Sequence, residues 1–388
     1  MTTNLPATPS PPDAITRALA LAPKLAARAS EADTRGGVPD ASVADFLDTG
    51  LHKLMQPARY GGWAMGWDVH VAASLELGAG DGSQAWALTS YTDNAQLVSM
   101  MAPQAQDEVW QPDPRALISA SLAPLGKLVP RGRDYVASGR WSAAAGIDHA
   151  QWLLGGAVLA EDGQERVVYV LVPTSAGKIV DDWHVMGLAG TGAKSFALDD
   201  TLILPHRVLD GKDYKEGTGP GARASTQLSS RVPHDGGSLA LACVALGIAR
   251  GMLDELVTMA RDTTKRGRRV ENDFATALRL AESEAEVDAA GIAAIAAARE
   301  TMEVLAKGET PSRERRALNT LKSAYGMLVA ARAADRLFAA GGAKANRLSS
   351  RLQRQLMDIH AAGAQEAFAW DAKASVYGRL LLGEESEL

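Results

Sequence analysis

The chain has 388 residues, which is more than one hydrophobic core usually accommodates, so two or three domains are expected. Its composition, 46% hydrophobic and 22% charged, is that of a globular protein, and a net charge of −6 without a basic stripe argues against nucleic-acid binding. The single Cys243 excludes internal disulfides and Cys-based zinc sites, and without a long apolar run or a secretory signal we expect a cytoplasmic protein with no membrane span.

The first part of the chain has the apolar spacing of helices. Residues 1–12 are rich in Pro and Thr and are expected to be disordered. Beyond them the pattern predicts a helical domain over residues 13–112. Its helices begin near Asp13 and Pro39 and then cover about 68–77, 84–100 and 103–110, and Asp81 is placed to cap the fourth of them.

The apolar period changes from 3.6 to 2 after residue 112, which predicts a β domain over residues 113–215. Polar or Gly-containing turns separate its short apolar segments. The expected strands are 116–122, 127–129, 135–137, 152–159, 167–171 and 196–204. The Gly-rich residues 211–224 are expected to form a loop.

Helical spacing returns for the rest of the chain and predicts a four-helix bundle over residues 225–388. The first helix begins at Gly237, and the other three are expected over about 274–306, 313–340 and 351–382. Their apolar faces are longer than one bundle needs, which favours association between subunits.

A Gly-rich turn, Trp183–Ser195, lies in the middle of the β domain. Its three glycines, Gly187, Gly190 and Gly192, allow positive φ angles and a close approach of the backbone to a ligand. It is not a nucleotide phosphate loop, because Ala193 precedes Lys194 and a strand rather than a helix follows. A glycine turn that binds no ligand remains an equal alternative on these residues alone.

Five motifs in order resemble the acyl-CoA dehydrogenase fold, over nearly the whole chain from Asp13. They are Pro57-x-x-Tyr60-Gly61-Gly62, Asp81-Gly82-Ser83-x-Ala85-Trp86, Ser138-Gly139-x-Trp141, Trp183-x-Val185-x-Gly187-x-x-Gly190-Thr191-Gly192 and Leu352-Gln353-Arg354-x-x-x-Asp358. The resemblance implies an α+β, mostly α fold, with an N-terminal helical domain, a central β-barrel-like domain and a C-terminal four-helix bundle.

Within this superfamily, the Leu352–Asp358 motif and the segment 148–152 (DHAQW) resemble the oxygenase components of two-component flavin monooxygenases. These include the 4-hydroxyphenylacetate 3-hydroxylase, steroid-ring hydroxylase and dibenzothiophene monooxygenase types. The resemblance implies reduced FMN or FAD from a separate NAD(P)H:flavin reductase, molecular oxygen, and a flavin hydroperoxide that oxygenates a small aromatic such as an indole or phenol. It also implies a homotetramer. Such chemistry requires a closed, apolar site.

The resemblance also implies which residues bind the flavin. Trp86, Trp141, Trp152 and Trp183 are expected as aromatic walls, although each could simply be a core residue. Arg266 or Arg268 is expected to hold a flavin phosphate across a subunit interface, with a solvated turn as the alternative. The remaining expected cofactor contacts are Ser119, Ala144, Ala145, Gly146, Thr191, Ala343, Lys344, Gln365 and Glu366.

The chain departs from the family pattern at two places. The family's Ser-Ser-Gly is Ala144-Ala145-Gly146, and the His expected seven residues after Asp358 is Gln365. A neutral amide cannot act as a base, so substrate activation is expected to differ. The expected catalytic residues are Ser121, His149 and Gln365, and no metal site is expected, because no His, Asp and Glu spacing resembles one.

Two other functions are compatible with the sequence. One is an acyl-CoA dehydrogenase or flavin oxidase, which would hold FAD tightly and need a catalytic carboxylate, for which Glu366 is the nearest candidate. The other is a non-catalytic member of the fold, suggested by the missing Ser and His. The retained Gly187–Gly192 turn and the basic run 265–269 argue against this second alternative.

Overall fold

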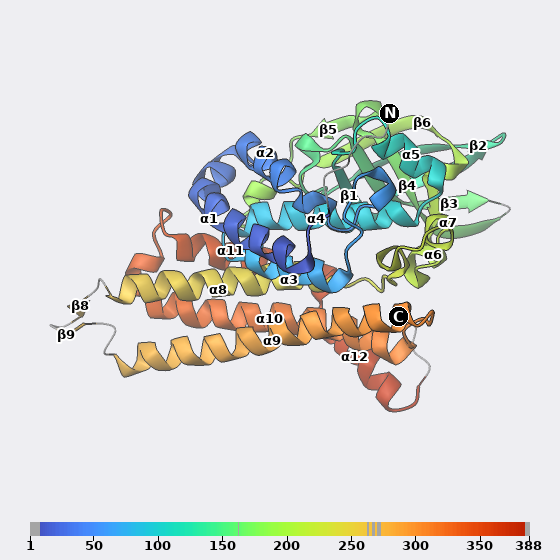
Figure 1. Cartoon of the computed structure of the whole chain (residues 1–388). Coiled ribbons are helices and arrows are strands. Elements are labelled where there is room, and N and C mark those ends of the chain that lie inside the picture. Colours follow the sequence, from blue (N-terminus) through green and yellow to red (C-terminus); the bar gives the residue numbers. More distant parts are fainter. Residues whose placement is uncertain (1–7, 162, 262–263, 266–267, 270–272, 385–388) are drawn as a thin grey trace.

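The computed structural model describes residues 8–161, 163–261, 264–265, 268–269 and 273–384. The N-terminal helices and the sheet lie together on one side of the long C-terminal helices (Figure 1). This confirms the mostly helical α+β fold expected from the sequence. In chain order, the sheet follows the N-terminal helices and precedes the C-terminal helical bundle.

Five helices form the N-terminal part. They are α1 (Pro11–Arg35), α2 (Asp40–Thr49), α3 (Trp67–Gly78), α4 (Gly82–Met100) and α5 (Pro103–Trp110). Ser10 and Asp13 form a capping box that starts α1 inside the segment expected to be disordered. Asp81 caps α4 as expected, since its side chain accepts from the Gln84 amide at 2.9 Å. Every residue of α4 except Ser90 and Asp93 is buried, so this helix lies at the centre of the molecule.

The sheet has seven strands in the order β5-β6-β2-β1-β3-β4-β7. They are β1 (Ile118–Arg131), β2 (Asp134–Trp141), β3 (Trp152–Glu161), β4 (Gln164–Pro173), β5 (Lys178–Val180), β6 (Ser195–Ile203) and β7 (Val208–Asp210). Only β1 and β3 pair in parallel. The strands expected at 116–122 and 127–129 are one strand, β1, with an irregularity between Ser121 and Gly126.

The Gly-rich segment after the sheet was wrongly expected to be a loop. It contains the short helices α6 (Gly211–Glu216) and α7 (Pro220–Ala224). Asp210 caps α6 by accepting from the Lys212 amide, and Pro220 occupies the first position of α7, where a missing N–H costs nothing. These local capping residues outweigh the low helix propensity of the glycines.

The C-terminal part consists of α8 (Leu239–Arg261), α9 (Phe274–Ala306), α10 (Arg313–Ala345), α11 (Arg351–Gly363) and α12 (Trp370–Leu381). The single helix expected over 351–382 is wrong, because the chain leaves the helical path after Gly363 and makes a 3₁₀ turn, η9 (Glu366–Phe368). Between α8 and α9, the short strands β8 (Thr264–Lys265) and β9 (Arg268–Arg269) pair at the far end of the bundle (Figure 1).

One apolar core joins the three parts. It contains residues of α1, α3 and α4, the inner face of the sheet, and α8, α10 and α11. Small residues bring α3 and α8 together, since a Cβ atom on Gly78 would lie 2.3 Å from the Val244 carbonyl oxygen. Within the described residues, no helix combines the length and the apolar character needed to cross a membrane.

Candidate active site

The Gly-rich turn is fixed by hydrogen bonds to its own backbone and to α11. The Trp183 Nε1 and the Thr191 hydroxyl both donate to the Leu188 carbonyl, at 3.0 and 2.7 Å. The Leu188 amide donates to Asp358 Oδ1 on α11 at 2.6 Å. The turn therefore ties the β domain to the C-terminal helices at a buried junction.

The glycines of this turn make room for protein rather than for a ligand. A Cβ on Gly187 would lie 2.1 Å from the Met357 carbonyl oxygen, and one on Gly190 would lie 2.7 Å from the Ala32 Cβ. Only Gly192 among the three has a positive φ, of +57°. The close backbone approach predicted from the glycines is real, but its partners are α11 and α1.

Asp358 is buried at the centre of this junction. Its Oδ2 has no hydrogen-bond partner within the described residues. Burial, followed by the nearby charge of Asp81, raises the pKa of Asp358 well above its usual value. Arg354 lies next to this pair and forms an ion pair with Asp33 of α1. The neutral acid is therefore the favoured form of Asp358, and it holds the turn in place without a buried charge.

The segment expected to contact the flavin ring, Ala144–Gly146, is held by two hydroxyl groups, and a third holds the backbone just before it. Ser119 Oγ donates to the Ala145 carbonyl at 2.8 Å, and Tyr91 donates to the Gly146 carbonyl at 2.6 Å. Ser121 Oγ donates to the Ser142 carbonyl at 2.6 Å. The serine hydroxyls expected beside flavin and substrate thus position the backbone of this loop.

The Ala145 amide has no hydrogen-bond partner among the described residues, although Ala145 is only 7% exposed. The two neighbouring amides are satisfied, because Ala144 donates to the Lys194 carbonyl and Gly146 to the Thr191 carbonyl. Buried amides are nearly always paired, so the unpaired Ala145 N–H indicates a place for an external acceptor.

Three of the four tryptophans expected as walls, Trp86, Trp183 and Trp141, have different surroundings. The Trp86 ring packs edge-on against Phe368 of η9, with ring centroids 6.2 Å apart. Trp183 is half-buried, and its N–H donates to the Leu188 carbonyl. Trp141 is fully buried over Gly126 and Gly155 and donates to the Gly156 carbonyl, so it belongs to the core of the sheet.

Gln365 and Glu366 lie outside any α-helix. Gln365 precedes η9, three residues before Phe368, and both Gln365 and Glu366 are exposed. His360, on the preceding helix, pairs with Asp335 at the surface, with 2.9 Å between Nε2 and Oδ1. The break in the helix thus places Gln365 at the edge of the region where Trp86 and Phe368 meet.

The remaining predicted site residues are spread over the surface. The His149 ring contacts the Val38 carbonyl, with 2.8 Å between Nε2 and the oxygen, and so links the β domain to the α1–α2 connection. Ala343 and Lys344 are exposed near the end of α10. Arg266 lies outside the described residues, and Arg268 belongs to β9 at the tip of the bundle.

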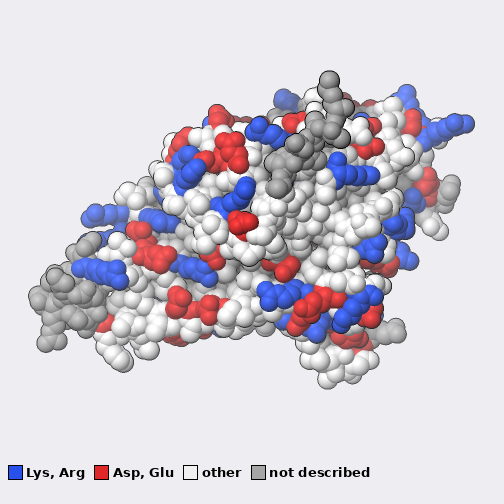
Figure 2. Space-filling model, viewed as in Figure 1, with Lys and Arg blue, Asp and Glu red and all other residues white. Residues whose placement is uncertain are grey.

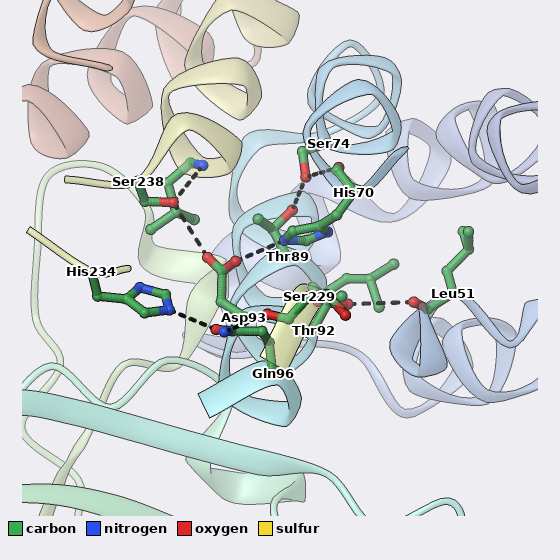
Figure 3. Close-up of polar contacts among 12 residues, drawn as sticks. Leu51, His70, Ser74, Thr89, Thr92, Asp93, Gln96, Ser229, His234 and Ser238 are labelled. Carbon is green, nitrogen blue, oxygen red and sulfur yellow. Dashed lines mark hydrogen bonds and ion pairs between the residues drawn. The ribbon is translucent and has the colours of Figure 1, made fainter. Parts of the chain in front are cut away.

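Sequence reasoning missed a polar group on α4 that Figure 3 shows in detail. Asp93 Oδ1 lies 2.8 Å from His70 Nε2, and Oδ2 accepts from Ser238 Oγ at 3.3 Å. The spacing contained a usable signal, because Asp93 follows Trp86 by seven residues and so shares its face of the helix. Phe368 was also missed, because it was expected inside a continuous helix.

The surface charge gives no competing binding site on the face drawn in Figure 2. Lys and Arg are interspersed with Asp and Glu there, and wide neutral areas separate them. This distribution agrees with the net charge of −6 and differs from the continuous basic surface of nucleic-acid-binding proteins.

Comparison with known proteins gives matches over nearly the whole chain. Residues 239–370 match the family described as acyl-CoA dehydrogenase, C-terminal domain. The chain is 32% identical over 362 residues to the FADH(2)-dependent resorcinol hydroxylase, oxygenase component, of Rhizobium sp. (strain MTP-10005), covering 90% of this chain and 88% of the relative.

Two further similar proteins are hydroxylases. The p-hydroxyphenylacetate 3-hydroxylase, oxygenase component, of Acinetobacter baumannii is 28% identical over 94% of this chain and 88% of its own length. The crystal structure of 3-HSA hydroxylase from Rhodococcus sp. RHA1 superposes with a TM-score of 0.92 at 27% identity, covering 96% of this chain and 97% of that one.

Proposed function

Because the chain belongs to the family of oxygenase components of flavin-dependent monooxygenases, we propose that it uses reduced FMN or FAD and molecular oxygen to oxygenate a small phenol or indole at the Trp86–Ala145 junction. A separate NAD(P)H:flavin reductase supplies the reduced flavin. The observation that carries the location of the site is the unpaired, buried Ala145 amide between the Trp183 turn and α4.

The residues of the junction fit a flat, partly apolar ring system with a few acceptor atoms. The Ala145 N–H can donate to a ring acceptor, and the half-buried Trp183 side chain can pack against the ring system. Bound reduced flavin supplies the activation of oxygen. The protein's part would be to orient the ring, and the packed side chains of Trp86 and Phe368 would help to exclude water from it.

The acyl-CoA dehydrogenase alternative needs a carboxylate aimed into this junction. Glu366, the candidate for that role, is exposed on η9. Asp358, which is buried there, is bound to the Leu188 amide and is favoured in its neutral form by burial. Neither group is placed as a free base, which supports oxygenation over dehydrogenation.

A homotetramer is part of this proposal. Phe274, Leu278 and Ile292 follow one face of α9 and are 81%, 55% and 61% exposed. Apolar side chains of this size on one helix face are typical of subunit contacts. In this proposal, Arg266 or Arg268 of one subunit holds the phosphate of a flavin bound to another subunit. Light scattering of the purified chain, with a Leu278→Glu variant, tests the association directly.

The test of the proposed activity is anaerobic titration with reduced FMN and with reduced FAD, followed by rapid mixing with oxygen. We expect a transient near-ultraviolet absorbance before oxidised flavin accumulates, and incorporation of one ¹⁸O atom from ¹⁸O₂ into resorcinol or indole. Reoxidation in one phase at the rate of free flavin, with all oxygen recovered as hydrogen peroxide, would refute the proposal.

A further inference from the structure

The two segments that meet at the Ala145 amide each contain a residue with a left-handed backbone. In the described part of the chain, four residues other than glycine have a positive φ, namely Ala64, Ala143, Leu188 and Asp200. Ala143, with a φ of +58°, directly precedes the Ala145 loop (Ala144–Gly146), and Leu188, with a φ of +57°, lies in the Gly-rich turn. Residues with a Cβ rarely adopt this conformation, because the Cβ comes too close to the following carbonyl oxygen.

The peptide groups on both sides of Ala143 are held by hydrogen bonds. The Ser142 carbonyl, in the peptide group before Ala143, accepts from Ser121 Oγ at 2.6 Å. The Ala144 amide, in the peptide group after it, donates to the Lys194 carbonyl at 3.2 Å. Ala143 itself is exposed, so its conformation is imposed by these partners on β1 and just before β6, and not by packing of its own methyl group.

Leu188 is held in the same way from both sides. Its amide donates to Asp358 Oδ1 on α11 at 2.6 Å. Its carbonyl accepts from Trp183 Nε1 at 3.0 Å and from Thr191 Oγ1 at 2.7 Å. The left-handed conformation of Leu188 is therefore fixed by three side chains, two from the turn and one from α11.

Hydrogen bonds connect these two residues to the direction of the Ala145 N–H. The peptide group that carries this N–H is held at its other end, because the Ala144 carbonyl accepts from the Ile147 amide at 3.2 Å. The next peptide group is held at both ends, since the Ala145 carbonyl accepts from Ser119 and the Gly146 amide donates to the Thr191 carbonyl at 2.8 Å. The direction of the unpaired N–H is thus set by the folded chain before any ligand binds.

We infer that Ala143 and Leu188 are positioning residues, whose left-handed conformations keep the Ala145 N–H aimed at its acceptor on the flavin. The inference rests on the proposed function and names what fixes the flavin-binding loop. Strained backbone conformations persist only where their surroundings over-determine them, and they are concentrated at binding and catalytic sites. A donor that is already fixed costs little ordering entropy when the ligand binds. Ser121, expected as a catalytic residue, acts in this arrangement through Ala143.

An alanine at position 143 restricts the loop more than a glycine would. Glycine adopts positive and negative φ almost equally well, so it would remove the strain and also allow the loop other directions. The relief of strain offsets the greater freedom of glycine in the unfolded chain, so stability should be maintained. A fall in flavin affinity without a fall in stability is a result that the loss of a merely structural contact does not give.

The test compares Ala143→Gly with Ala64→Gly in the full chain. Ala64 is the matched control, because it is an alanine with a φ of +48° outside the candidate site. We expect Ala143→Gly to raise the dissociation constants for reduced FMN and reduced FAD about three- to tenfold in anaerobic titrations, whereas Ala64→Gly leaves them unchanged. Both variants should unfold at urea concentrations no lower than the wild type.

Ala143→Asn separates the conformation from the methyl group. Asparagine tolerates the left-handed region better than other residues with a Cβ, and position 143 is exposed, so the longer side chain has room. We expect this variant to bind reduced flavin within about twofold of the wild type, because the backbone conformation is kept. A loss of affinity equal to that of Ala143→Gly would assign the effect to the side chain and overturn the inference.

The remaining outcomes separate the inference from the proposed function. If the wild type binds neither reduced FMN nor reduced FAD, the proposed function fails and the inference fails with it. If the wild type binds reduced flavin and Ala143→Gly binds it equally well, the flavin site stands and the positioning role is refuted. A lower urea midpoint for Ala143→Gly than for the wild type would show that Ala143 is not strained, which also contradicts the inference.

Discussion

The junction around Asp358 and the outer face of the C-terminal helices differ in how complete they are within one chain. At the junction, Gly187, Leu188 and Asp358 are buried and tied together, and a hydroxyl group holds the loop at Ala145. In the C-terminal part of the chain, four of the predicted cofactor contacts are exposed. These are Ala343, Lys344, Gln365 and Glu366.

The junction is therefore formed by the chain's own packing, whereas the proposed contacts in the C-terminal part lie at the surface of the single chain. Substitutions at the junction should therefore act on stability and on flavin binding together. Substitutions at the proposed surface contacts should act on flavin binding alone.

The largest effect is expected from Gly187→Ala at the junction. The new Cβ would lie 2.1 Å from the Met357 carbonyl oxygen, so backbone must move, at a cost of about 3 kcal/mol. We expect a large fall in the thermal unfolding midpoint together with a loss of flavin affinity. Gly378→Ala on α12, where a Cβ meets nothing within 4 Å, is the matched control and should be neutral. Equal stability of the two variants would show that the junction at Gly187 is not packed as tightly as the structure indicates.

The proposed phosphate contact of the basic run 265–269 is tested by the double substitution Arg266→Ala and Arg268→Ala. If these arginines hold the flavin phosphate, affinity for reduced flavin should fall about tenfold or more, with the unfolding midpoint unchanged. Anaerobic titration measures the affinity. Arg131→Ala with Arg133→Ala, at the exposed end of the β1–β2 hairpin, controls for the loss of two positive charges. Unchanged affinity would show that the basic run is only a solvated turn.

Ser119→Ala tests whether the junction positions the Ala145 loop. The substitution leaves the Ala145 carbonyl without its 2.8 Å partner in a buried place, which costs about 1 kcal/mol. We expect a modest loss of stability by urea unfolding and a severalfold weaker binding of reduced flavin. Ser30→Ala, at an exposed position of α1, should change neither quantity. A loss of stability with normal flavin binding would show that the Ala145 loop is not part of the flavin site.

Asp358→Asn is expected to have the smallest effect, and its sign depends on pH. Burial raises the pKa of Asp358 in the folded protein above its value in the unfolded chain. The contribution of the Asp358 side chain to the free energy of unfolding is therefore complete below the unfolded pKa. It is lost as the pH rises through the folded pKa. Asn stays neutral. The variant should be within about 1 kcal/mol of the wild type at pH 5 and gain relative to it toward pH 8. Urea unfolding across this range measures the difference, with Asp48→Asn, at an exposed position of α2, as control. A gap that is constant with pH would mean that Asp358 does not titrate in this way.

The sequence alone determined the order of the parts and the positions of most helices. Apolar spacing with caps such as Asp81 is local information, and it placed the helix over 274–306 with the bounds that the structure gives. The motifs ending at Asp358 also identified the family. Local rules failed where capping residues overcame glycine, in α6 and α7, and where the last helix breaks after Gly363.

Only the tertiary structure decided what the glycines and polar groups do. The same Gly187 could have approached a ligand, and packing shows that it approaches Met357 instead. Ser119 carries a hydroxyl in either role, and the fold directs it to the Ala145 carbonyl. Asp93 is paired with His70 and Ser238, which lie 23 and 145 residues away in sequence. A side chain's partners are set by which distant elements pack against it, and a linear pattern does not contain that information.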